Sequence, residues 1–165
     1  MRKHISLTVL FVTVLFLVGM FPAAAAWSAK KMPSFSLEDV VTGKKVTSAS
    51  FADKSLLVTF FATWCPPCIQ EIPNLIDLQE EYRGQGFTVV GISVDQEKRV
   101  VRDLVTDKDI NYPVVMADKA VTRNFGGVYG IPTSFLVNSN GTVVKKYTGY
   151  VPHSTLVRDI EQIIK

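Results

Sequence analysis

Apolar residues recur along the chain at two spacings, which together predict strands alternating with helices. Runs that are almost wholly apolar, such as 55–62 and 87–95, are typical of strands covered on both faces. Apolar residues three and four positions apart follow these runs and predict amphipathic helices. The predicted elements, in chain order, are a hairpin at 35–46, a strand at 55–62, a helix at 66–83, a strand at 87–95, a helix at 96–108, a strand at 112–117, a helical turn at 118–125, paired strands at 133–138 and 142–149, and a helix at 153–165.

The order of these elements predicts an α/β domain with a mixed central sheet and helices on both of its faces. Thr42 and Gly43 mark the turn of the first hairpin, which we expect to pack on one edge of the domain. Pro73 falls inside the helix at 66–83 and should kink it, because proline cannot donate a hydrogen bond to the preceding turn.

The N-terminus has a different character from the rest of the chain. Arg2 and Lys3 precede an uncharged apolar stretch at 5–21, and small residues follow up to Ala26. This pattern is typical of a cleaved export signal. The stretch is also long enough to remain as a membrane anchor. Either interpretation of 1–26 places the following domain outside the cytoplasm, with a linker at 27–34 and one domain at 35–165.

Composition narrows the class of protein further. The chain has 165 residues, of which 47% are hydrophobic and 20% charged, as expected of one globular domain. Residues 1–26 hold two basic residues and no acidic one, so the rest of the chain has 16 basic and 15 acidic residues. A near-neutral domain gives no electrostatic case for binding nucleic acid, which requires a basic surface.

The two cysteines, Cys65 and Cys68, are two residues apart, at the join between a strand and a helix. A structural disulfide across so short a loop would constrain the unfolded chain little. A zinc or copper site needs three or four ligands, and the exported part of the chain adds only His153. Two buried thiols acting as small hydrophobes would not need prolines between them. A redox couple fits the position best, because ligands bind and reactions take place at the carboxyl ends of strands in open α/β sheets.

The helix start explains how such a couple would be activated. Pro66 and Pro67 suit the first turn of a helix, where their missing N–H groups would be unpaired anyway. Cys65 would then lie at the N-terminal end of the helix, which favours an anion. A thiol with a pKa of about 8.5 is only about 3% thiolate at pH 7, and a fall of about 1.5 units makes it about half ionised. Cys68, one turn inside, is expected to be less exposed and to resolve the mixed disulfide.

The segment "FFATWCPPC", with "YGIPTSFLVNSNGTVV" some 65 residues later, resembles the thioredoxin superfamily. It is most similar to the exported TlpA-like thiol–disulfide oxidoreductases, the group of TlpA, ResA and CcmG, over about residues 33–165. Trp64 before the cysteines, Glu71 after them, and Ile131 with Pro132 carry this resemblance. It implies a thioredoxin fold with an N-terminal hairpin and a central insertion, here at 109–130.

The resemblance also implies roles for individual residues. Cys65 would be the nucleophile, Cys68 the resolving cysteine, and Glu71 the group that handles the proton of Cys68, although a solvated helix carboxylate is the plainer interpretation of that glutamate. Thr59 stands where thioredoxin itself carries a buried acid. The residues expected to meet substrate are Trp64, Pro66, Pro67, Ile131 and Pro132, with the bond before Pro132 in the cis form and Tyr129 and Gly130 nearby.

The resemblance implies a reductase of protein disulfides that needs no metal and no cofactor beyond the Cys65–Cys68 disulfide. A membrane protein would supply electrons, and apocytochrome c would be a client. Two alternatives stay open: a thiol peroxidase, whose usual threonine and proline are replaced here by Ala62 and Val58, and a metallochaperone for copper-centre assembly.

Overall fold

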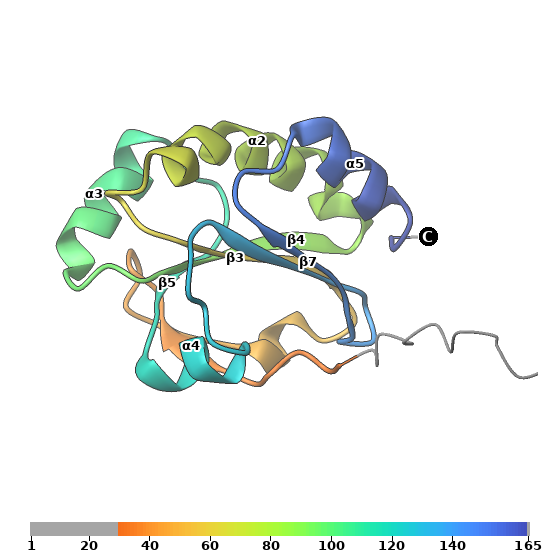
Figure 1. Cartoon of the computed structure of the whole chain (residues 1–165), viewed down its shortest axis with the longest axis horizontal. Helices are drawn as coiled ribbons and strands as arrows, with labels where there is room; N and C mark the ends of the chain where they lie inside the picture. Colours follow the sequence, from red (N-terminus) through yellow and green to blue (C-terminus); the bar gives the residue numbers. More distant parts are fainter. Residues whose placement is uncertain (1–29, 165) are drawn as a thin grey trace, which may run out of the picture.

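The computed structural model describes residues 30–164, so the predicted signal or anchor at 1–26 lies outside the described residues. Within the described part, no helix combines the length and the apolar character needed to span a bilayer. The described residues form the predicted mixed sheet, with helices on both sides (Figure 1).

The central sheet has five strands in the order β5-β4-β3-β6-β7. β3 pairs in parallel with β4, and β4 with β5, whereas β6 and β7 run antiparallel to their neighbours. Every residue of β3 and β4 is buried, as their apolar runs predict. The strands are β3 (Ser55–Phe61), β4 (Phe87–Ser93), β5 (Val114–Met116), β6 (Thr133–Val137) and β7 (Val143–Thr148).

Two hydrophobic cores lie on opposite faces of this sheet. Three helices cover one face, and a shorter helix covers the other face together with the N-terminal hairpin and a single 3-10 turn, η1 (Figure 1). The first group is α2 (Pro66–Tyr82), α3 (Lys98–Asp107) and α5 (His153–Glu161), and the second is β1 (Ser36–Glu38), β2 (Lys45–Thr47), η1 (Ser48–Phe51) and α4 (Lys119–Asn124). A second 3-10 turn, η2 (Arg83–Gln85), follows α2. This arrangement confirms the α/β prediction.

Several elements are shorter than predicted. β5 begins only at Val114, directly after Pro113, which has no N–H to contribute to the sheet. α3 begins at Lys98 rather than 96, and α5 ends at Glu161 rather than 165. Pro73 lies inside α2, which continues past it to Tyr82.

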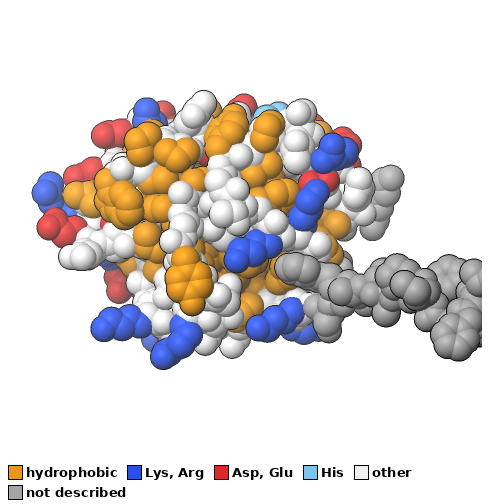
Figure 2. All heavy atoms as spheres, in the orientation of Figure 1, with side chains coloured by type: hydrophobic (Ala, Val, Ile, Leu, Met, Phe, Trp, Pro, Cys, Tyr) orange, Lys and Arg blue, Asp and Glu red, His pale blue; other side chains and the backbone are white. Residues whose placement is uncertain are grey.

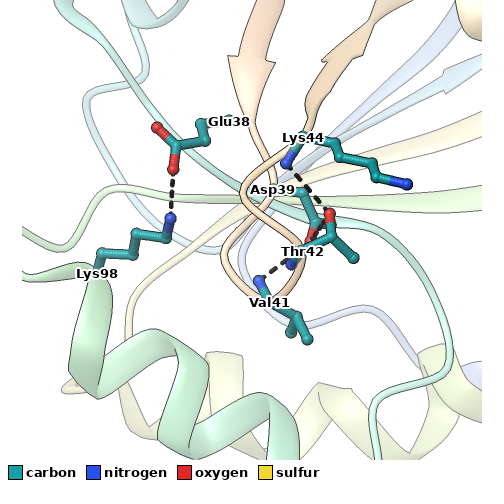
Figure 3. Close-up of polar contacts among 6 residues, drawn as sticks. All are labelled: Glu38, Asp39, Val41, Thr42, Lys44 and Lys98. Atoms are coloured by element: carbon teal, nitrogen blue, oxygen red, sulfur yellow. Dashed lines mark hydrogen bonds and ion pairs between the residues drawn. The ribbon is translucent and has the colours of Figure 1, made fainter.

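The N-terminal hairpin packs on one edge of the sheet, as predicted. Its backbone joins β5, where the N–H of Val40 donates to the carbonyl of Val114 at 2.9 Å. Figure 3 shows the turn of the hairpin, in which the Asp39 carboxylate accepts from the N–H groups of Val41 and Thr42. An ion pair between Glu38 and Lys98 links the hairpin to α3 (Figure 3). The hairpin is thereby fixed to the same helix and strand that flank the carboxyl end of β4.

The last part of the predicted linker also contacts the domain. The N–H of Met32 donates to the carbonyl of Gly141, and the N–H of Val143 donates to the carbonyl of Lys30, both at 2.9 Å. Residues 30–32 therefore extend along the turn between β6 and β7.

Candidate active site

Cys65 and Cys68 form a disulfide at the join between β3 and α2, with their Cα atoms 5.3 Å apart. Cys65 is the N-cap residue of α2, and Pro66 and Pro67 occupy the first two helical positions. Its carbonyl accepts the first hydrogen bond of the helix, from the N–H of Ile69 at 3.1 Å. The predicted helix start is therefore confirmed, and the sulfur of Cys65 lies at the N-terminal end of α2, where the helix dipole favours a negative charge.

The loop before β6 closes over the same sulfur. The peptide bond between Ile131 and Pro132 is cis, as the family resemblance implies. The carbonyl oxygen of Ile131 lies 3.7 Å from Sγ of Cys65. Residues that are 66 positions apart thus meet at the disulfide, and the backbone of Ile131 becomes part of the wall around Cys65.

Glu71 is buried on the same face of α2 as Cys68, one helical turn away. Only 2% of the residue is exposed, so the solvated helix carboxylate considered from the sequence is wrong. Its Oε1 accepts from the N–H of Val151 at 3.1 Å, in the loop between β7 and α5. Burial raises the pKa of Glu71 from 4.5 to about 7, although the bond from Val151 opposes the rise. A carboxyl group that titrates near neutrality therefore lies inside the domain beside Cys68.

Tyr112 adds to the buried surroundings of Glu71. Burial raises the pKa of Tyr112 well above its ordinary value, and the negative charge of Glu71 raises it further. The phenol therefore stays protonated across the pH range in which Glu71 titrates.

Exposed apolar side chains surround the disulfide. Trp64 is 69% exposed, Pro66 and Pro67 are exposed, and Ile131 is partly buried. Figure 2 shows hydrophobic side chains gathered on this face, over the end of β3 and the start of α2. Such a surface beside a reactive sulfur suits contact with another protein. An open pocket of about 410 Å³ lies on one side, lined by Thr63, Trp64, Val94, Asp95, Gln96, Glu97 and Val100.

Two expectations from the sequence concern neighbouring positions. Thr59, in the place of the buried acid of thioredoxin, pairs with Ser134 across β3 and β6, at 2.9 Å between the hydroxyl oxygens. Tyr129, expected near the site, is 97% exposed, and its ring packs over the backbone of Gly127. Gly127 has a φ of 73°, in the left-handed region that other residues rarely adopt, so the position favours glycine.

Asp95 is a polar residue of the site that the sequence analysis did not single out. It is the second residue after the buried strand β4, and only 8% of it is exposed. Its carboxylate accepts from the backbone N–H and the hydroxyl of Thr63, two residues before Cys65. The sequence could have pointed to this residue, because it is charged and lies near the carboxyl end of a central strand. Ligands bind at such ends in open α/β sheets.

Among residues 30–164, no group of three or more His, Cys, Asp and Glu side chains is arranged to hold a metal ion. Around Cys65 and Cys68 the structure brings together the buried carboxyl group of Glu71, the loop with the cis bond before Pro132, and the exposed side chain of Trp64. These groups can support the exchange of a disulfide between this chain and another.

Comparisons with known proteins agree with this arrangement. The profile of the Redoxin family matches residues 28–164. Thiol-disulfide oxidoreductase ResA of Bacillus subtilis is 32% identical over 133 residues, which are 81% of this chain and 73% of ResA. The ResA protein of Bacillus cereus strain ZK is 33% identical over 122 residues, 73% of this chain and 69% of its own length. A thiol:disulfide interchange protein of the thioredoxin family from Chlorobium tepidum superimposes with a TM-score of 0.79 and 37% identity, covering 86% of this chain and all of its own.

Proposed function

Because the chain belongs to the redoxin family and, within it, to the TlpA-like thiol–disulfide oxidoreductases, we propose that it is an exported reductase of protein disulfides. The observation that carries the proposal is the Cys65–Cys68 disulfide at the start of α2, beside a buried glutamate that titrates near neutrality. The apolar surface around Trp64 supports a protein substrate rather than a small one.

In the proposed reaction, the reduced protein starts with a thiolate at Cys65 and a thiol at Cys68. The thiolate of Cys65 attacks one sulfur of the client disulfide, and the other client sulfur leaves as a thiolate that takes a proton from water. Cys68 then attacks Sγ of Cys65 and releases the second client sulfur. The client gains two electrons, and this chain is left with its Cys65–Cys68 disulfide, as found in the structure.

Glu71 is proposed as the acceptor of the proton that Cys68 must lose in the second step. A thiol attacks only as a thiolate, and Cys68 lies one turn inside the helix, away from the N-terminal end where the helix dipole favours a negative charge. A carboxyl group with a pKa of about 7 can accept this proton and release it again near neutral pH.

The surroundings of the reaction follow from the family. We propose that the domain works on the outer side of the cytoplasmic membrane, exported or anchored by residues 1–26. A membrane protein would reduce the Cys65–Cys68 disulfide after each turnover, and the haem-attachment cysteines of an apocytochrome c would be clients. The copper-assembly and peroxidase alternatives gain no specific support from the side chains around the disulfide.

The direction of electron flow is tested by the reduction potential of the Cys65–Cys68 couple. A reductase should have a potential below that of the glutathione couple, which is about −220 to −260 mV. Equilibration with glutathione buffers, followed by counting of free thiols, measures this value. A potential well above the glutathione range would make the protein an oxidant and would refute the reductase proposal.

The role of Glu71 is tested by Glu71→Gln, with Glu80→Gln on the exposed face of the same helix as the matched control. If Glu71 accepts the proton of Cys68, resolution of the mixed disulfide should slow by about a hundredfold near pH 7. The titration of the thiols should also shift, because a nearby negative charge is removed. Stopped-flow reduction of a disulfide peptide and pH-dependent alkylation measure both. Unchanged titration together with unchanged turnover would contradict the role.

A further inference from the structure

Asp95 is hydrogen-bonded to the segment that leads into the disulfide, although it belongs to the loop after β4. Its Oδ2 accepts from the N–H of Thr63 at 2.9 Å, and its Oδ1 accepts from the Thr63 hydroxyl at 2.7 Å. The Ser93 hydroxyl donates to Oδ2 at 2.7 Å. Both carboxylate oxygens therefore act only as acceptors, which suits the ionised form of the group.

These bonds fix the conformation of the chain between β3 and α2. The N–H of Cys65 donates to the carbonyl of Ala62 at 3.2 Å, which closes a tight turn around Thr63 and Trp64. The N–H of Val94 donates to the carbonyl of Phe61 and holds the two strand ends together. Asp95 completes this attachment from the side of β4. Through its hydrogen bonds to Thr63, the loop after β4 holds the residues just before Cys65.

The charge of Asp95 has a second consequence. No ion pair involving Asp95 forms among residues 30–164, and the pocket beside Trp64 is lined by Asp95 and Glu97 but by no basic residue. Asp95 is bonded to Thr63, two residues before Cys65, and a buried negative charge in this neighbourhood disfavours the Cys65 thiolate. The thiolate belongs to the reduced protein, so the charge favours the disulfide and makes the dithiol a stronger donor of electrons.

We infer that Asp95 is a positioning residue for Cys65, which holds the Thr63–Cys65 turn against β4 and whose negative charge keeps the dithiol reducing. The inference rests on the proposed role of Cys65 as the attacking sulfur. It extends the site beyond the helix that carries the cysteines, because the end of the neighbouring strand sets the properties of the sulfur.

The test compares Asp95→Asn with Asp159→Asn in the full domain. Asp159 is also buried and also has three donors, Lys145, Tyr147 and Arg158, but its partners lie on β7 and α5. Each substitution removes one buried charge and alters the hydrogen bonds of one carboxylate. Only Asp95→Asn should lower the pKa of the Cys65 thiol, by roughly half a unit to one unit, and shift the equilibrium with glutathione three- to tenfold toward the reduced protein.

A second pair of variants keeps the inference open to refutation if Asp95→Asn fails to fold. Thr63→Val removes the hydroxyl donor but keeps the Asp95 charge, and should slow alkylation of Cys65. Thr63→Ser keeps the donor and should restore the rate.

Two results would overturn the inference. Asp95→Asn and Asp159→Asn could leave the thiol pKa and the glutathione equilibrium equally unchanged, or Thr63→Val could react like the parent protein. A parent protein whose reduction potential lies well above the glutathione range would instead refute the proposed reductase, so the two failures can be distinguished.

Discussion

Replacing Cys65 by serine should reduce the rate of disulfide reduction by roughly a thousandfold or more, to that of the uncatalysed reaction. Cys65 is the residue at the N-terminus of α2, and its sulfur faces the carbonyl of Ile131. A serine hydroxyl at this position cannot form the mixed disulfide, and Cys68 cannot replace it from a position one turn inside the helix. Insulin reduction, followed by turbidity, measures the loss.

Cys68→Ser provides the complementary result. Cys65 can still attack a client, but the mixed disulfide cannot be resolved and should accumulate to one client per protein. Non-reducing electrophoresis followed by mass spectrometry would identify the trapped proteins, with Cys65→Ser as the control that should trap few. Trapping by Cys65→Ser at the level of Cys68→Ser would show that the order of attack proposed here is reversed.

The fold was predictable from the sequence because its strongest signals are periodic. The apolar runs of β3 and β4 leave no polar face, and only the interior of a covered sheet accommodates such strands. Helix ends were less predictable. α5 ends at Glu161 although Ile163 and Ile164 continue its apolar spacing, because the chain there turns back with N–H bonds from both residues to the carbonyl of Ile160.

The candidate site was predictable where the residues are close in sequence. Pro66 and Pro67 predict a helix start directly after Cys65, because proline is favoured in the first turn of a helix. The structure has that start. The cis bond before Pro132 has no periodic signal and came from the family resemblance.

Contacts between distant segments could not be predicted in this way. Glu71 occupies a position on the buried face of α2, yet its burial is completed by the loop at Val151, 80 residues later. Asp95 receives its hydrogen bonds from Thr63, 32 residues earlier. A single carboxylate at the end of a strand has the same local pattern whether it faces solvent or another loop. Whether such a carboxylate is exposed or bonded to another loop depends on how the whole sheet packs, which the local sequence does not show.

Glu71 should make the folded protein progressively less stable as the pH rises from about 4 to 8. Burial raises the pKa of Glu71 in the folded protein from 4.5 to about 7. Between these two values the folded protein holds a proton that the unfolded chain releases, so a rise in pH favours unfolding. The contribution is fully favourable below pH 4.5 and is lost as the pH passes through 7. A difference of about 2.5 pKa units lowers the free energy of unfolding by about 3 kcal/mol between low and high pH.

Glu71→Gln should therefore unfold at higher denaturant concentration than the parent protein at pH 8, with about 3 kcal/mol more stability, and at nearly the same concentration at pH 4. Glutamine keeps an oxygen that can accept from the N–H of Val151 but never acquires a charge. Urea unfolding of the oxidised proteins at several pH values measures the difference, with Glu80→Gln as a control that should follow the parent at every pH. Parallel curves for Glu71→Gln and the parent would mean that the carboxyl group is not neutral at pH 6. Near neutral pH, glutamine at position 71 would therefore make the protein more stable than glutamate does. Packing alone does not explain why glutamate is present, whereas the proposed exchange of a proton with Cys68 requires a carboxyl group.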